Sequence, residues 1–172
     1  MERRVYKVYD MKVKTFYLLS AIPGSGKSTW ANLYKQSHKN VFIVSSDELR
    51  LELFGGVQNF SNEKLVWDTF LKRINDYALN NEDCTVIADA TNLENKFRMF
   101  YFDNTPIFDK HILVLFPLPF KQCLKQNEER EQNRIVPLDV MKRLNSQFED
   151  PSEEVLSSYD EIIKVDRDFI NK

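Results

Sequence analysis

The sequence of 172 residues predicts an α/β fold, in which a parallel sheet of about five strands is flanked by helices. Two observations predict it: short apolar runs alternate with segments of helical spacing, and a glycine-rich turn follows the first run. Alternation of this kind favours parallel pairing, and such sheets bind ligands at the carboxyl ends of their strands. We therefore expect the functional residues at that edge.

Short runs of β-branched, aromatic and aliphatic residues have the composition of buried strands. They lie at 15–20, 41–45, 84–89, 111–116 and 160–166. Pro117 and Pro119 halt the fourth run, because proline donates no hydrogen bond to a sheet.

The segments between these runs carry apolar residues at the three- and four-residue spacing of amphipathic helices. The first helix, at 29–36, is predicted to present Trp30, Leu33 and Tyr34 on one face. Ser61 is expected to cap a long helix. The apolar face of that helix comprises Leu65, Val66, Phe70, Ile74 and Tyr77.

Three further helices are predicted, separated by breaks in the pattern. One contains Phe97, Phe100 and Tyr101, and two charged helices at 120–133 and 136–148 form what we name the lid segment, about 119–148. Between the second strand and the long helix, 51–60 breaks at a glycine pair and suggests a loop over the site. The abundant aromatic residues are interpreted as core filling.

Length and composition exclude several classes of protein. The length indicates one domain over 1–172, with a basic lead-in at 1–14 that lacks the apolar run of a secretory signal. No stretch approaches the roughly 18 apolar residues of a membrane span. The net charge of −2 neither demands nor excludes a nucleic-acid partner, which a local basic groove would hold.

Cysteines and histidines are isolated in the sequence. Cys84 and Cys123 lack the spacing of a paired metal site, so we expect two packing thiols in a reduced, cytoplasmic protein. His38 and His111 are expected at the surface or at a strand edge.

The stretch SAIPGSGKST at 20–29 resembles the phosphate-binding pattern GxxxxGK(S/T), and it lies between a predicted strand and a predicted helix. Its backbone N–H groups would surround ATP phosphates, with Lys27 on the β- and γ-phosphates and the Ser28 hydroxyl on Mg²⁺. Pro23 has no N–H and would stiffen the loop. The ATP-binding residues predicted by this pattern are Pro23, Gly24, Ser25, Gly26, Lys27, Ser28 and Thr29.

Ala21 occupies the position of the first glycine in that pattern. If its φ angle is negative, the substitution costs little, whereas a positive φ would cost roughly 1 kcal/mol. In either case we expect the phosphate-binding loop to form.

Polar residues follow the second and third strands. Asp47 could accept the proton of a substrate hydroxyl, and Arg50, three residues on, could bind an acceptor phosphate, although a helix-capping aspartate beside a solvated arginine is the alternative. Asp89 could help to hold Mg²⁺ and contact the acceptor, or merely cap the next helix. Thr91 and Asn92 are candidate hydrogen-bonding partners of the acceptor.

Arg130 and Arg134 lie near the Val136-Pro137 turn of the lid segment. They could cover the nucleotide and neutralise charge in the transition state. Acidic neighbours at 128, 129 and 131 leave surface ion pairing as the alternative.

In this order and approximate spacing, SAIPGSGKSTW, SSDELR, DATN and NEEREQNRIVPLDVMKR resemble the kinase domain of bacteriophage polynucleotide kinase and its P-loop relatives. The resemblance covers nearly the whole chain and implies a P-loop kinase fold, with Asp47 as general base for a 5′-hydroxyl and Arg50 on the acceptor phosphate. The N-x-x-R element of the family's lid matches Asn127 and Arg130.

Two departures from the family pattern affect the site. One extra residue separates Arg130 from the Val-Pro turn, so Arg130 and Arg134 compete for the lid role. Ala90 intervenes between Asp89 and the Thr-Asn pair, which puts the contact of Asp89 in question.

The leading functional hypothesis is an ATP- and Mg²⁺-dependent kinase of RNA or DNA 5′-hydroxyl ends, acting in repair or end-healing and linked to a nucleic-acid ligase. The alternative is a kinase of a small hydroxyl substrate, such as a nucleoside, nucleotide, antibiotic or nucleotide sugar. A nucleotide-dependent switch or binding module is a third possibility. Arg50 favours an acceptor that carries a phosphate, and Asp47 argues against the switch because a switch needs no acceptor base.

Overall fold

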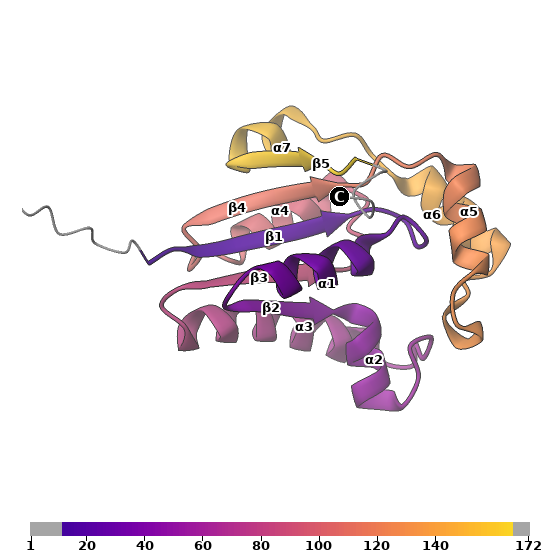
Figure 1. The fold of residues 1–172 in the computed structure, drawn as a ribbon, viewed down its shortest axis with the longest axis horizontal. Coiled ribbons are helices and arrows are strands. Elements are labelled where there is room, and N and C mark those ends of the chain that lie inside the picture. The colour runs from indigo at the N-terminus through magenta and orange to yellow at the C-terminus, as the bar shows by residue number, and fades with distance from the viewer. Residues whose placement is uncertain (1–11, 167–172) are drawn as a thin grey trace, which may run out of the picture.

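Five parallel strands form one sheet in the order β2-β3-β1-β4-β5 in the computed structural model, which describes residues 12–166 (Figure 1). The predicted lead-in therefore lies mostly outside the described residues. The strands are β1 Lys14–Ser20, β2 Val41–Ser45, β3 Cys84–Asp89, β4 Lys110–Leu115 and β5 Glu161–Lys164. The predicted strand number and parallel pairing are confirmed.

The helices lie on both faces of the sheet and beyond the carboxyl ends of its strands. They are α1 Lys27–Ser37, α2 Ser46–Phe54, α3 Glu63–Asn80, α4 Asn95–Asp103, α5 Phe120–Glu128, α6 Leu138–Gln147 and α7 Glu153–Ser158, with a 3₁₀ turn, η1, at Gln132–Arg134. Figure 1 shows α1 on the face opposite α3 and α4, and α2, α5 and α6 at the carboxyl ends of the strands. No helix in 12–166 is both long and apolar enough to span a membrane.

Alternate residues of β1 enter two separate cores, as the two-residue period of a strand requires. Phe16 and Leu18 pack with Phe70 of α3 on one face. Tyr17 and Leu19 pack on the other face, in the cluster that contains Ala31 of α1. Burial on both faces explains why these strands read as continuous apolar runs.

Several predicted helix boundaries were wrong. Helix α2 continues to Phe54, so the predicted loop at 51–60 begins only at Gly55, where a φ of 78° ends the helix. Asn62, and not Ser61, caps α3 by accepting a hydrogen bond from Leu65 N. Helix α5 ends at Glu128, five residues before the predicted end. The six-residue α7 was not predicted, because it is too short to show periodicity.

Some predicted burial was also wrong. Leu33 and Leu65 are 40% and 42% exposed, whereas Val66, Phe70 and Ile74 of the predicted face of α3 are buried as expected, together with Ala78. Phe97 and Phe100 are exposed, because α4 turns Arg98 and Tyr101 inward.

One histidine and both cysteines are buried, whereas the other histidine is exposed. His111 is buried within β4, where its Nε2 lies 2.8 Å from Thr105 O and burial lowers its pKa, so the prediction of a surface or strand-edge position was wrong. His38 is exposed at the end of α1, as expected. Cys84 and Cys123 are free and buried, which confirms their packing role.

Arg98 is a fully buried arginine that ties three segments together. Its guanidinium donates to Ser20 Oγ (3.0 Å), Asn95 Oδ1 (2.8 Å) and Glu149 O (2.7 Å), and its own carbonyl accepts from Tyr159 Oη (2.6 Å). Burial lowers its pKa. Because Ser20 immediately precedes the glycine-rich turn, this network anchors the base of that turn.

Arg98→Met should lower the free energy of unfolding by about 3 kcal/mol, since buried acceptors would lose their donors at roughly 1–3 kcal/mol each. Denaturant unfolding would measure the change. The control is Lys96→Met on the exposed side of the same helix, which should change stability by less than about 0.5 kcal/mol. Equal stability of the two variants would contradict an anchoring role for Arg98.

Candidate functional site

The glycine-rich turn has the backbone geometry of an anion-binding loop. Gly24 and Gly26 adopt φ angles of 80° and 95°, which favour glycine, and α1 begins at once with Lys27. No side chain caps the first N–H groups of α1. A helix start of this kind, behind a loop of convergent N–H groups, is suited to bind phosphate.

Ala21 does not strain this loop. Its φ angle is not positive, its side chain is buried, and its N–H donates to Thr91 O at 2.9 Å. The conformational cost of alanine at this position is therefore small, and the end of β1 does not require a glycine here.

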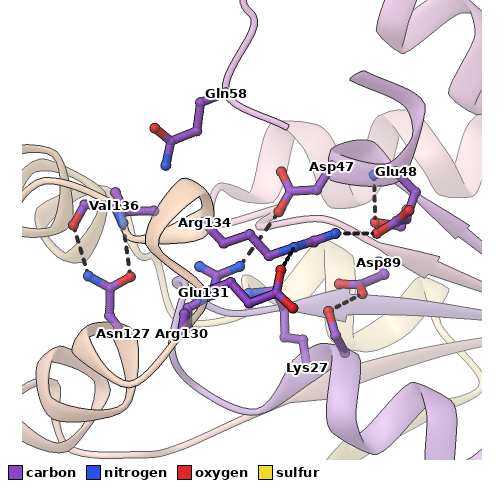
Figure 2. Close-up of polar contacts among 12 residues, drawn as sticks. Lys27, Asp47, Glu48, Gln58, Asp89, Asn127, Arg130, Glu131, Arg134 and Val136 are labelled. Atoms are coloured by element: carbon purple, nitrogen blue, oxygen red, sulfur yellow. Dashed lines mark hydrogen bonds and ion pairs between the residues drawn. The ribbon is translucent and has the colours of Figure 1, made fainter. Parts of the chain in front are cut away.

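Lys27 and Asp89 lie near each other where β1 and β3 end (Figure 2), and Ser28 contacts Asp89. Lys27 Nζ donates to Ile22 O at 2.9 Å, and Ser28 Oγ donates to Asp89 Oδ2 at 2.7 Å. Desolvation of the ammonium group lowers the pKa of Lys27, while the negative charge of Asp89 opposes that effect. Burial raises the pKa of Asp89, against the influence of Lys27 and the Ser28 hydrogen bond.

Asp47 lies in the first turn of α2, directly after β2, and Arg50 holds its side chain. Arg50 Nη1 donates to Asp47 Oδ1 at 3.1 Å, while Arg50 Nε and Nη2 donate to Glu63 at 3.1 and 2.7 Å. The Arg50 side chain is 8% exposed, whereas that of Asp47 is 40% exposed. The arrangement leaves Asp47 open to a reactant and fixes its orientation.

The lid segment places Arg130 and Arg134 against α2 (Figure 2). Arg130 Nη2 lies 3.7 Å from Asp47 Oδ2, and Arg134 Nη2 donates to Glu48 Oε1 at 2.7 Å. Arg134 also pairs with Glu131 at 3.8 Å, as the alternative of surface pairing anticipated. The positive charge of Arg130 adds to the lowering of the pKa of Lys27 and opposes the rise in the pKa of Asp89.

Asn127 fixes the turn that carries these arginines. Its side chain is buried and exchanges two hydrogen bonds with Val136, Nδ2 to O at 2.8 Å and N to Oδ1 at 3.0 Å. Gln58 Nε2 donates to Ile135 O at 2.8 Å, so the loop after α2 does lie over the site and contacts the lid segment.

The phosphate loop packs directly on α5. A Cβ atom added to Gly24 would lie 2.3 Å from the carbonyl oxygen of Cys123 and 3.1 Å from the N of Asn127. Only glycine fits between the loop and the helix, so the positions of the two are coupled.

These elements enclose a cleft of about 510 Å³, within the range of small-molecule sites. The cleft brings together Asp47, Arg50, Asp89, Thr91, Arg130, Arg134 and every predicted ATP-binding residue except Ser25. Ser25 is buried behind the loop, and its Oγ has no hydrogen-bond partner among residues 12–166. Asn92 also does not line the cleft, because its side-chain amide donates to the carbonyl oxygen of Leu19 in β1.

Sequence reasoning missed part of the lining. Phe60, Trp67 and Arg143 line the cleft, although the aromatic residues were assigned to the core. Glu63 lies outside the lining but orients Arg50 from α3, and no local pattern pairs residues so far apart in the sequence. The three- and four-residue spacing of Val140, Arg143 and Leu144, which line the cleft from α6, was the available signal for Arg143.

The donor set fits ATP and Mg²⁺. Ser28 and Asp89 offer adjacent hydroxyl and carboxylate oxygens, and Mg²⁺ is commonly bound by one or two carboxylates together with phosphates and water. Lys27 and the uncapped start of α1 would hold the phosphates. No group of three or more Cys, His, Asp or Glu side chains in 12–166 could hold a metal alone, so the phosphates would supply the remaining ligands.

A family model described as an AAA domain matches residues 20–151, and the chain belongs to that family. The sheet and its phosphate loop have the P-loop kinase fold. No curated protein sequence matches the chain.

Solved structures share this fold at low identity. A chain of the Pnkp1/Rnl/Hen1 RNA repair complex is 21% identical, with a TM-score of 0.72 over 91% of this chain and 49% of that chain. A fungal RNA kinase is 16% identical, with a TM-score of 0.62 over 90% and 75% of the two chains. A gluconokinase from Sinorhizobium meliloti is 14% identical, with a TM-score of 0.59 over 91% and 84%.

These likenesses show the fold. The chain spans about half the length of the repair-complex chains that it matches.

Gly24→Ala should abolish or strongly weaken ATP binding, because the new Cβ would force the phosphate loop away from Cys123 O. Gly55→Ala is a matched control: its φ of 78° imposes the same backbone strain, but no atom lies within 4 Å of the added Cβ. Calorimetric titration with ATP would compare the two. ATP affinities that fall equally would contradict the coupling of the loop to α5.

Arg130→Ala should lower the rate of phosphoryl transfer more than Arg134→Ala, because Arg130 lies 3.7 Å from the Asp47 carboxylate, whereas Arg134 pairs with Glu48, which lies outside the cleft lining. We expect a loss of about 10²–10³ in kcat for Arg130→Ala, with a smaller change in ATP affinity. Single-turnover kinetics would separate the two effects. The reverse order would assign the lid role to Arg134.

Proposed function

We propose that this chain transfers the γ-phosphate of ATP to the 5′-hydroxyl of RNA or DNA ends. The observation that carries the proposal is the position of Asp47, a partly exposed carboxylate in the same cleft as the phosphate loop. It lies between Arg50 and Arg130, and its negative charge opposes the lowering of the pKa of Lys27. A carboxylate held there suits a general base for a hydroxyl acceptor.

In the proposed reaction the 5′-hydroxyl oxygen bonds to the γ-phosphorus, and the bond from that phosphorus to the β,γ-bridging oxygen breaks. The electron pair leaves with ADP, and the Asp47 carboxylate takes the hydroxyl proton. Lys27 and Arg130 would stabilise the charge on the transferring group, while Mg²⁺ at Ser28 and Asp89 would neutralise phosphate charge. Thr91 lies in the lining near Asp89 and is a candidate contact for the acceptor.

Two further observations support a polynucleotide acceptor. The cleft lining contains more basic than acidic side chains, although the whole chain is net acidic. Solved structures of RNA repair and RNA kinase proteins share the fold. A 5′-phosphate end is what a nucleic-acid ligase consumes, so we place the reaction before a ligation step.

A kinase of small hydroxyl compounds is the second candidate. The likeness to a gluconokinase and to a shikimate kinase supports it, because the same fold accepts such substrates. Arg50 weighs against a free sugar, since an acceptor without a phosphate leaves the two remaining guanidinium N–H groups without a specific role.

Labelled ATP, offered with 5′-hydroxyl RNA, 5′-hydroxyl DNA, nucleoside 3′-phosphates, nucleosides and sugars in parallel, would test the proposal. We expect the highest kcat/KM for 5′-hydroxyl ends and no transfer by Lys27→Ala, which lacks the phosphate-bound charge. Transfer to a nucleoside or sugar without transfer to any 5′-hydroxyl end would replace the proposal by the small-molecule kinase. ATP hydrolysis without transfer to any acceptor would support a switch.

A further inference from the structure

An exposed aromatic ring stands beside the proposed acceptor base. Phe60, in the loop between α2 and α3, is 60% exposed and lines the cleft together with Trp67 of α3. The guanidinium carbon of Arg50 lies 4.9 Å from the centroid of the Phe60 ring and 5.5 Å from that of Trp67. Arg50 therefore sits against both rings while it orients Asp47.

The loop that carries Phe60 is held in place on both sides of the ring. Asn59 Oδ1 accepts hydrogen bonds from Ser61 N at 3.1 Å and from Ser61 Oγ at 2.6 Å. Gln58 is bonded to Ile135 of the lid segment. The ring is thus preorganised towards the cleft, and burial in a core does not explain its presence.

Arg143 of α6 lines the same cleft. Its side chain is exposed and makes no ion pair within residues 12–166, whereas Arg50, Arg130 and Arg134 are all paired with carboxylates. Arg143 is therefore available to an external anion.

The cleft concentrates positive charge. Its basic side chains are Lys27, Arg50, Arg130, Arg134 and Arg143, and its acidic ones are Asp47 and Asp89. Such a lining complements a chain of phosphates, and an aromatic face with an adjacent guanidinium suits a nucleobase. A sugar or other small aliphatic hydroxyl compound would use neither feature.

We propose that this cleft binds a single-stranded nucleic acid, with the 5′-terminal base stacked on Phe60 and a phosphodiester beyond the first nucleotide paired with Arg143. The inference rests on the proposed function and specifies the acceptor of that reaction as a single strand. A single strand is required because a base must leave its duplex stack to present a face to the ring.

Phe60→Ala should raise the KM for a 5′-hydroxyl oligonucleotide about 5- to 100-fold, with the KM for ATP unchanged. Phe60→Tyr, which keeps an aromatic face, should retain the wild-type KM and shows that the loop still forms. The matched control is Phe97→Ala, since Phe97 is 44% exposed and faces Lys96 at 5.0 Å but lies outside the cleft.

An oligonucleotide with an abasic 5′-terminal residue separates stacking from other effects. Wild type and Phe60→Ala should phosphorylate it with similar KM values, because neither can stack a missing base. An equal defect of Phe60→Ala on the abasic and the intact strand would overturn the base contact, as would an unchanged KM on the intact strand.

Arg143→Gln should raise the KM for the oligonucleotide and lower the slope of log KM against log salt by about 0.7, the value for one phosphate of a single strand. A nucleoside 3′-phosphate, which lacks the further phosphodiester, should be unaffected. The control is the exposed neighbour Lys142→Gln, which lies outside the cleft. Equal salt slopes for Arg143→Gln and wild type would overturn the phosphate contact.

The failure of the proposed function looks different from the failure of this inference. If wild type labels no 5′-hydroxyl end, the proposed function fails and the inference falls with it. If wild type labels such ends and Phe60→Ala and Arg143→Gln behave like their controls, only the inference fails.

Discussion

The chain of ion pairs that crosses the cleft is the interaction on which the site depends. It runs from Glu63 to Arg50, from Arg50 to Asp47 and from Asp47 to Arg130, with separations of 2.7, 3.1 and 3.7 Å. Arg50 is nearly buried and is satisfied by two carboxylates, so its charge is not left uncompensated. Arg50 consequently orients the Asp47 carboxylate and Arg130 faces it. Asp47 nevertheless stays accessible to a reactant.

The order of the strands brings these ion pairs close to the phosphate loop. Because β3 lies between β1 and β2, the carboxyl ends of these strands bring the loop, Asp89 and Asp47 to one edge. The loop is in turn fixed on two sides, by the Arg98 network at Ser20 and by the contact of Gly24 with Cys123 O. A movement of the lid segment therefore has to alter both the loop, through Gly24, and the base, through Arg130.

The sequence predicted the fold and most of the cleft because both depend on local signals. Apolar runs identify the strands, and Gly24, Gly26 and Lys27 identify the loop by the backbone angles and charge that phosphate requires. What the sequence did not reveal depends on contacts without a local pattern: His111 is buried in β4 with its ring against Thr105 O, Arg98 reaches Ser20 of β1, and Glu63 joins the site across an intervening loop. The aromatic residues as a group were assigned to the core, and Phe60 was not singled out, because hydrophobicity alone does not distinguish a packed ring from one that faces a cleft.

The most direct test of the account is a comparison of Asp47→Asn with wild type under single-turnover conditions, with ATP affinity measured on the same samples. The asparagine keeps the shape of the side chain and its hydrogen bond from Arg50 but cannot take a proton. If Asp47 is the general base, ATP affinity is unchanged and the rate of transfer to a 5′-hydroxyl end falls by roughly 10²–10⁴. Wild-type transfer by Asp47→Asn would contradict that role.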